Sequence, residues 1–214
     1  MTETTLTRRS LALAIAATPL AGLAQAQPAL TTADEALADR AAQYLQGLTE
    51  ARGRFVQTDA RGQVSQGSLF LKRPGKARFA YDPPSGLLVV SDGNIVSVAD
   101  ARLKTFDKYP LSATPLSLFL ARTIRLDRNV RVTRVTRSPG GFSVTARDTG
   151  KQTSGALTLD FQDRPMALAG WAVTDAQGRV TRVRLSGLSP ASGLDKSLFV
   201  LKDTRQVNPG RGKV

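Results

Sequence analysis

Alternating hydrophobic and polar positions run through most of this chain. In extended backbone, successive side chains point to opposite faces, so strict alternation predicts a strand with one buried face. Leu157, Leu159 and Phe161 share such a face, opposite Thr158 and Asp160. The pattern and the turn residues between its segments predict strands at residues 54–58, 63–73, 77–81, 87–91, 95–99, 102–108, 130–137, 141–147, 154–161, 166–174 and 180–185.

Short turns join most of these segments, and the Ser91-Asp92-Gly93-Asn94 turn is typical of a tight hairpin. Consecutive strands joined in this way form an antiparallel meander, and a meander of about ten strands must curl or close. The sequence therefore predicts a mainly β protein of the α+β kind. Its strongly curved antiparallel sheet forms a half-open β-barrel.

Two segments change to helical spacing. Residues 33–48 begin with Thr32 as N-cap and Glu35 three residues later, which is a capping-box pattern. The apolar stripe of this amphipathic helix comprises Leu37, Ala41, Tyr44, Leu45 and Leu48. Residues 114–121 predict a short, almost wholly apolar helix with Pro115 at its first position. Both helices are expected to cover the sheet, the short one as a lid, and residues 194–201 end the fold as a helix or a strand.

The first 26 residues have the form of a cleavable export signal. Arg8 and Arg9 precede an uncharged run over residues 10–24, which ends in the cleavage pattern Ala24-Gln25-Ala26. A short membrane anchor is the alternative, although the run is shorter than the roughly 20 residues that span a bilayer. The general secretory and twin-arginine routes both fit the paired arginines. We expect one domain over residues 27–204 and a flexible tail over residues 205–214.

The composition restricts the chemistry of the chain. It contains no His and no Cys, which excludes Ser-His-Asp and Cys-His catalysis, disulfides and the usual zinc ligands. We find no paired-carboxylate or phosphate-loop pattern, and so expect no enzyme, catalytic residue, cofactor or metal. The formal net charge of +13 favours anionic lipid surfaces or acidic partners, or describes a solvated surface. Export argues against nucleic acid as a partner.

Arg73 ends the apolar row Leu69, Leu71, Arg73 on one face of the predicted strand 63–73. A buried guanidinium is costly unless its five donors find acceptors. One interpretation is that Arg73 reaches across a cavity and holds a movable piece of backbone. The alternative is an arginine at the rim whose head group stays in water.

The segments around Arg73 resemble the LolA family, the periplasmic carriers of outer-membrane lipoproteins. The resemblance rests on residues 67–74, Arg78-Phe79, Tyr81-Asp82-Pro83, residues 89–93 and the segment from Thr114-Pro115-Leu116 to Ala121-Arg122. It implies a monomeric periplasmic carrier. Its partners would be triacylated lipoproteins, a lipoprotein-releasing ABC transporter of the inner membrane and, where one is used, an outer-membrane receptor.

The resemblance also implies site residues. It assigns Arg73 as the latch that closes the lid over the empty cavity. The residues expected to line an acyl-chain cavity are Leu69, Leu71, Phe79, Tyr81, Leu88, Val90, Leu116 and Phe119. Plain core packing is the alternative for each of them, and we place Trp171 in the core. The family often has tryptophan where this chain has Phe79, and Ala77 is smaller than the family pattern expects.

Two other functions remain open on the sequence. A lipid or lipoprotein sensor on a similar half-barrel would regulate a membrane partner. An exported hydrolase or lyase would need chemistry without His or Cys. Arginines also recur at every third position from Arg122 to Arg137, a period that fits neither a strand face nor a helix face. They mark either a basic surface for a partner or lipid phosphate, or a solvated surface.

Overall fold

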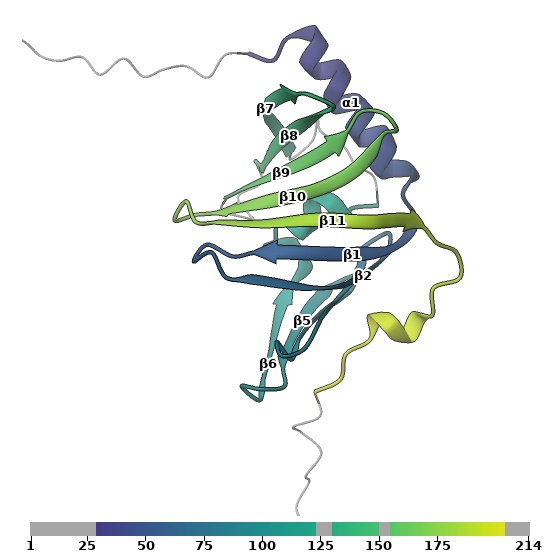
Figure 1. The fold of residues 1–214 in the computed structure, drawn as a ribbon, viewed down its shortest axis with the longest axis vertical. Helices are drawn as coiled ribbons and strands as arrows, with labels where there is room; N and C mark the ends of the chain where they lie inside the picture. The colour runs from purple at the N-terminus through teal and green to yellow at the C-terminus, as the bar shows by residue number, and fades with distance from the viewer. Residues whose placement is uncertain (1–28, 123–129, 150–154, 204–214) are drawn as a thin grey trace, which may run out of the picture.

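The computed structural model describes residues 29–122, 130–149 and 155–203 (Figure 1). The predicted signal over residues 1–26 and the predicted tail over residues 205–214 lie outside the described residues. The described strands form one sheet. They are β1 Glu50–Thr58, β2 Val64–Lys72, β3 Lys76–Tyr81, β4 Leu87–Asp92, β5 Ile95–Asp100, β6 Thr105–Pro110, β7 Val130–Ser138, β8 Gly141–Asp148, β9 Gly155–Gln162, β10 Ala167–Asp175 and β11 Val180–Pro190.

The sheet is an antiparallel meander in two arms. The near arm comprises β1 to β6, and the far arm comprises β7 to β11. The strand order is β6-β5-β4-β3-β2-β1-β11-β10-β9-β8-β7, so consecutive strands are neighbours within each arm. The arms meet where the first strand pairs with the last, with Phe55 opposite Leu185. The sheet curves strongly around its inner face and remains open between β6 and β7 (Figure 1). The predicted curved antiparallel sheet is confirmed.

Some strand ends differ from the prediction because side chains or pairing decide them. The backbone N–H groups of Arg102 and Leu103 both donate to the Asp100 carboxylate, and this local turn delays β6 until Thr105. β1 begins at Glu50, before the predicted residue 54, because its first residues pair with β2. β11 continues to Pro190 because β1 supplies it with a partner strand.

Helix α1 (Thr32–Gly47) lies on the inner side of the sheet. Its N-cap is Thr31 rather than the predicted Thr32. The Thr31 hydroxyl accepts from the Asp34 N–H, and the Asp34 carboxylate accepts from the Thr31 N–H, so the capping box is one residue earlier. Two ion pairs tie α1 to the far arm of the sheet: Arg40 with Asp163 at 2.6 Å and Arg137 with Asp34 at 2.9 Å.

The second inner element is the predicted short helix, α2 (Leu116–Leu120), preceded by the turn of 3-10 helix η1 (Leu111–Ala113). Pro115 is its N-cap rather than its first helical residue. Phe119 and Leu120 are both buried, so α2 inserts apolar side chains into the inner face. A helix of this length is not stable alone, and its packing holds it in place.

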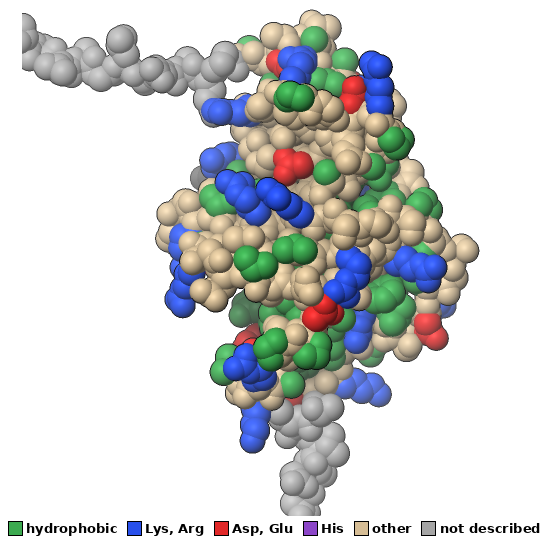
Figure 2. Space-filling model, in the orientation of Figure 1, with side chains coloured by type: hydrophobic (Ala, Val, Ile, Leu, Met, Phe, Trp, Pro, Cys, Tyr) green, Lys and Arg blue, Asp and Glu red, His purple; other side chains and the backbone are tan. Residues whose placement is uncertain are grey.

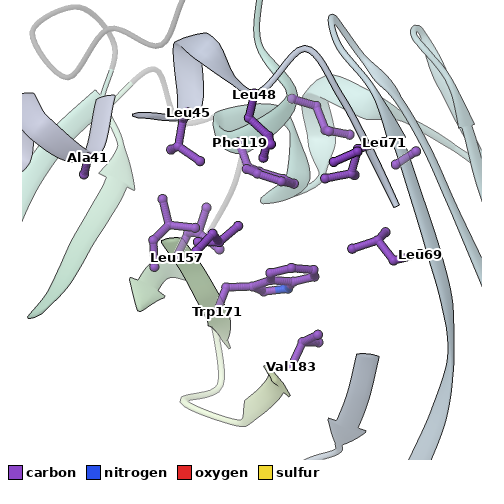
Figure 3. Packing of buried hydrophobic residues seen from close by; sticks show 14 of the residues in the cluster. Ala41, Leu45, Leu48, Leu69, Leu71, Phe119, Leu157, Trp171 and Val183 are labelled. Atoms are coloured by element: carbon purple, nitrogen blue, oxygen red, sulfur yellow. The ribbon is translucent and has the colours of Figure 1, made fainter. Parts of the chain in front are cut away.

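The hydrophobic core fills the space between the curved sheet and these two helices (Figure 3). Leu45 and Leu48 approach it from the end of α1, Phe119 from α2, and Leu157 and Trp171 from the opposite arm of the sheet. The predicted face of Leu157, Leu159 and Phe161 is buried here, as is Trp171. Inner residues alternate with outer ones along the strands, as a one-sided sheet requires, except at register shifts in the β1–β11, β9–β10 and β7–β8 pairs.

The C-terminal strap, residues 191–203, crosses the outer face of the sheet. It contains the 3-10 helix η2 (Lys196–Phe199), which lies against β3 and β4. Arg78 donates from Nη1 to the Leu198 carbonyl at 3.1 Å, and Lys72 donates from Nζ to the Leu194 carbonyl at 2.9 Å. The strap buries Phe199 almost completely. It therefore gives the near arm of the sheet a second packed layer.

Candidate functional site

Arg73 joins the two inner helices. Its side chain leaves the turn after β2 and donates from Nη1 to the carbonyl of Leu45, in the last turn of α1. Its Nη2 donates to the carbonyl of Ala121, directly after α2, at 2.6 Å. One side chain thus connects three segments that are 28 and 48 residues apart in the chain.

The electrostatics of this site come from helix ends. The last carbonyls of a helix lack intrahelical partners and carry the negative end of its dipole. Helix α1 has no basic residue in its own last turn, so Arg73 supplies the cation from outside the helix. Burial lowers the pKa of Arg73 from its ordinary value, and its Nε has no hydrogen-bond partner among the described residues. The partly buried guanidinium of Arg73 is therefore stabilised by carbonyl groups and not by a carboxylate.

A second contact fixes α2 beside Arg73. The backbone N–H of Gly75 donates to the Leu120 carbonyl at 2.8 Å. The buried hydroxyl of Ser91 donates to the Gly75 carbonyl at 2.6 Å and so orients this peptide. Gly75 has φ +77°, and a Cβ there would lie 2.6 Å from the Cα of Gly93. Only glycine fits this turn, and Ser91 holds it in place.

Beneath α2 lies a row of aromatic rings. Phe119 stacks on Trp171 with ring centroids 5.7 Å apart, and Trp171 meets Phe79 edge-on at 6.0 Å. Phe55 continues the row through edge contacts with Phe79 and Tyr81. Figure 3 shows Phe119 pointing from α2 into this apolar interior, toward Trp171. Helix α2 therefore covers part of the inner face with the Phe119 ring.

Tyr81 marks the polar end of this row. Its hydroxyl donates to the side-chain oxygen of Gln57 at 2.9 Å, and burial raises its pKa to about 12. The phenol is therefore neutral at physiological pH. It adds one satisfied polar group to an otherwise apolar surface.

Six of the eight predicted cavity residues belong to the inner cluster, in which Leu69, Leu71, Phe79 and Phe119 are buried and Tyr81 and Leu116 partly so. Leu88 and Val90 are corrections, because both lie on the outer face. Val89 stands opposite Phe79 across the β3–β4 pair, so Val89 points inward and its neighbours point outward. Leu88 lines an outer cleft with Leu201 of the strap.

The structure adds residues that the sequence reading missed. Leu45 and Ala121 act through backbone oxygens, which carry no side-chain signal. Gln46 donates to the Arg122 carbonyl at 3.1 Å and adds a further bond between α1 and the end of α2. Ser91 could have been noticed as a serine inside an apolar strand, where a buried hydroxyl needs a partner.

A surface cleft of about 520 Å³ lies beside these contacts. Pro74, Gly75 and Asn94 line one part of it, and Leu120 and Ala121 line another. The end of α2 is therefore packed toward the inner face but borders open space on its other side.

Comparison with known proteins shows the family to which the chain belongs. The model of the family "Outer membrane lipoprotein carrier protein LolA" matches residues 46–202, which include Arg73 and α2. The chain belongs to the LolA family. An outer-membrane lipoprotein carrier protein of Methylobacillus flagellatus is 38% identical over 157 residues, covering 70% of this chain and 75% of that protein.

Two further similar proteins have lower sequence identity. A protein of the same name from Chromohalobacter salexigens is 27% identical over 191 residues, covering 85% of this chain and 90% of that one. A solved LolA superfamily protein from Nitrosomonas europaea superposes with a TM-score of 0.44 at 9% identity, covering 75% of this chain and 97% of that one. The LolA match begins at residue 46 and so leaves most of α1 outside it.

The described residues show neither a metal-binding cluster nor a membrane-spanning helix. Among them, no group of three or more acidic, His or Cys side chains is arranged to hold a metal ion. None of the described helices is long and apolar enough to cross a membrane.

Proposed function

We propose that this LolA-family protein is a periplasmic carrier that binds the acyl chains of lipoproteins on its inner face. Residues 1–26 would direct its export. It would receive triacylated lipoproteins from an ABC transporter of the inner membrane and deliver them to the outer membrane, as a monomer and without a covalent step. The observation that supports this most is Arg73, which closes an apolar interior through backbone bonds to two helices.

Acyl chains gain much from such an interior. Each methylene removed from water contributes roughly 0.8 kcal/mol, so three fatty chains would bind far too tightly to be released. A carrier must therefore oppose part of this gain. Displacing Phe119 from Trp171 and breaking the bonds of Arg73, Gly75 and Gln46 opposes it.

The environment of Arg73 limits the free energy that closing the lid contributes against cargo binding. Hydrogen bonds from the guanidinium stabilise the closed lid, but partial burial of its charge without a carboxylate reduces that gain. Opening the lid would free Nη2 of Arg73 from the Ala121 carbonyl and expose it to water. We infer that the lid closes with a small net free energy, which lowers cargo affinity without preventing entry.

Trp171 provides a direct test, because it is the one tryptophan of the chain and stacks on the lid. Titration with a synthetic triacylated cysteinyl peptide should change its emission as Phe119 leaves the ring, and the non-acylated peptide should leave it unchanged. Acylated peptide that binds by gel filtration without any change in Trp171 emission would refute cargo entry beneath α2.

Arg73→Leu tests the latch. The variant should still take up lipoprotein, since the apolar face is intact, but should release it poorly, since closing the lid no longer stabilises the empty state. Arg52→Leu, at an exposed position on β1, removes the same charge elsewhere and should transfer cargo normally. Normal release by Arg73→Leu would reject the latch.

A further inference from the structure

Several arginines of the described residues have partners, whereas a group of arginines on one face has none. Arg40, Arg54, Arg137 and Arg179 form ion pairs with carboxylates, and Arg73 and Arg78 donate to backbone carbonyls. Five exposed arginines on the outer face of the far arm have no hydrogen bond or ion pair with any described residue. This arginine face consists of Arg131 and Arg134 on β7, Arg147 on β8, and Arg182 and Arg184 on β11.

The strand register places these side chains together. Directly opposed residues in an antiparallel pair share a face. Arg134 stands opposite Thr145, and the same row continues through Thr158 and Ala172 to Arg182. With strands about 4.8 Å apart, the row spans about 19 Å. It therefore has arginines at both ends and small side chains between them.

Two of the arginines oppose each other directly. Arg131 is the cross-strand partner of Arg147, and like charges in that position destabilise a sheet. Between the arginines, the outward positions of the described strands carry one carboxylate, Asp160, and it accepts a hydrogen bond from Ser143 at 2.6 Å. The fold thus keeps an unfavourable concentration of positive charge that no internal contact requires.

Figure 2 shows this outer side of the molecule, with β9, β10 and β11 in front of α2 as in Figure 1. Lys and Arg side chains outnumber Asp and Glu side chains on it. The inner face with α2 is on the opposite side of the sheet. A ligand on the arginine face would therefore leave the lid free.

We propose that the arginine face binds the phosphate groups of an anionic phospholipid surface. Guanidinium groups pair with phosphate through two parallel hydrogen bonds. The floor between the arginines is formed by Thr145, Thr158, Ala172 and Gly170, which offer no large apolar anchor. The hydroxyl groups of Thr145 and Thr158 hydrogen-bond each other at 2.9 Å. Protein interfaces usually depend on buried aromatic or arginine anchors in pockets, so charge spread over the convex outer face of the sheet fits a lipid surface better. This site is independent of cargo binding.

The test uses the purified chain and sedimentation with vesicles of phosphatidylcholine, with or without phosphatidylglycerol. The protein should sediment only with the anionic vesicles, and raising the salt should release it because it screens the phosphates. Arg182→Gln/Arg184→Gln should lower the partition coefficient by roughly 30-fold. The matched control Arg102→Gln/Arg164→Gln removes the same charge from two exposed turns and should bind within about twofold of the unmodified chain.

A single variant separates binding from folding. Arg147→Gln should weaken vesicle binding and raise the melting temperature by about 1–3 °C, since it relieves the repulsion from Arg131. The proposal is overturned if the unmodified chain shows no preference for anionic vesicles, or if the matched control loses as much binding. Equal affinity for soluble polyglutamate would assign the face to acidic proteins and would also overturn it.

Discussion

The Arg73 side chain is held by hydrogen bonds to backbone oxygens alone, and the geometry of these bonds determines which substitutions can replace it. A lysine would keep the charge but cannot donate in two fixed directions at once, whereas the guanidinium serves Leu45 and Ala121 together. The parity of Leu69, Leu71 and Arg73 predicted that the side chain would point inward. The residues that receive its bonds had no such signal.

Ser91 gives a prediction at the same scale. Ser91→Ala leaves the buried Gly75 carbonyl without its donor and should lower the free energy of unfolding by about 1–3 kcal/mol. Because Gly75 donates to Leu120, the variant should also loosen α2 and increase quenching of Trp171 by acrylamide. Ser97→Ala, at a buried serine on the outer face of β5, is the control and should not alter quenching. Equal quenching in both variants would show that Ser91 does not position the lid.

At the scale of elements, the two inner helices differ in how they are held. Helix α1 is tied to the far arm by the ion pairs of Arg40 and Arg137 and by the edge contact of Tyr44 with Phe161 at 6.0 Å. Helix α2 depends on Phe119, Leu120 and a few backbone bonds beside an open cleft. We therefore expect α1 to act as a fixed wall and α2 to move.

The C-terminal strap allows a stability prediction for an element. Phe199→Ala should lower the free energy of unfolding by about 3–5 kcal/mol, because a buried aromatic ring is replaced by a cavity between the strap and β3–β4. Val200→Ala, at a position 55% exposed, should change it by less than about 0.5 kcal/mol. Denaturant unfolding of both variants measures the difference. Similar values for the two would mean that the strap is not part of the cooperative fold.

At the scale of the whole molecule, the carboxylates determine how stability depends on pH. Hydrogen bonds from Arg54, Arg40 and Arg179 lower the pKa values of Asp82, Asp163 and Asp175 respectively. A carboxyl group whose pKa is lower in the folded state contributes stability above its unfolded pKa of about 4. That contribution is lost as the pH falls toward the lowered value.

Stability should therefore be flat from about pH 5.5 to 8 and decline below about pH 4. The flat region is expected because the chain contains no histidine, the side chain that ordinarily titrates in that range. Thermal unfolding across this pH series measures it, and high salt should weaken the decline since these ion pairs are exposed. A stability maximum confined to a narrow band near pH 7 would contradict this account.

The sequence by itself determined where the strands and the two inner helices lie and which residues of β2, β3 and β9 face inward, because these depend on local periodicity and turn chemistry. It also placed Arg73 on the inward face. Only the tertiary structure decided that β1 pairs with β11, that Leu88 and Val90 lie outside, and that the arginines of β7, β8 and β11 share one surface. Those features depend on strand register and on backbone groups brought together from distant parts of the chain, which the order of side chains does not encode locally.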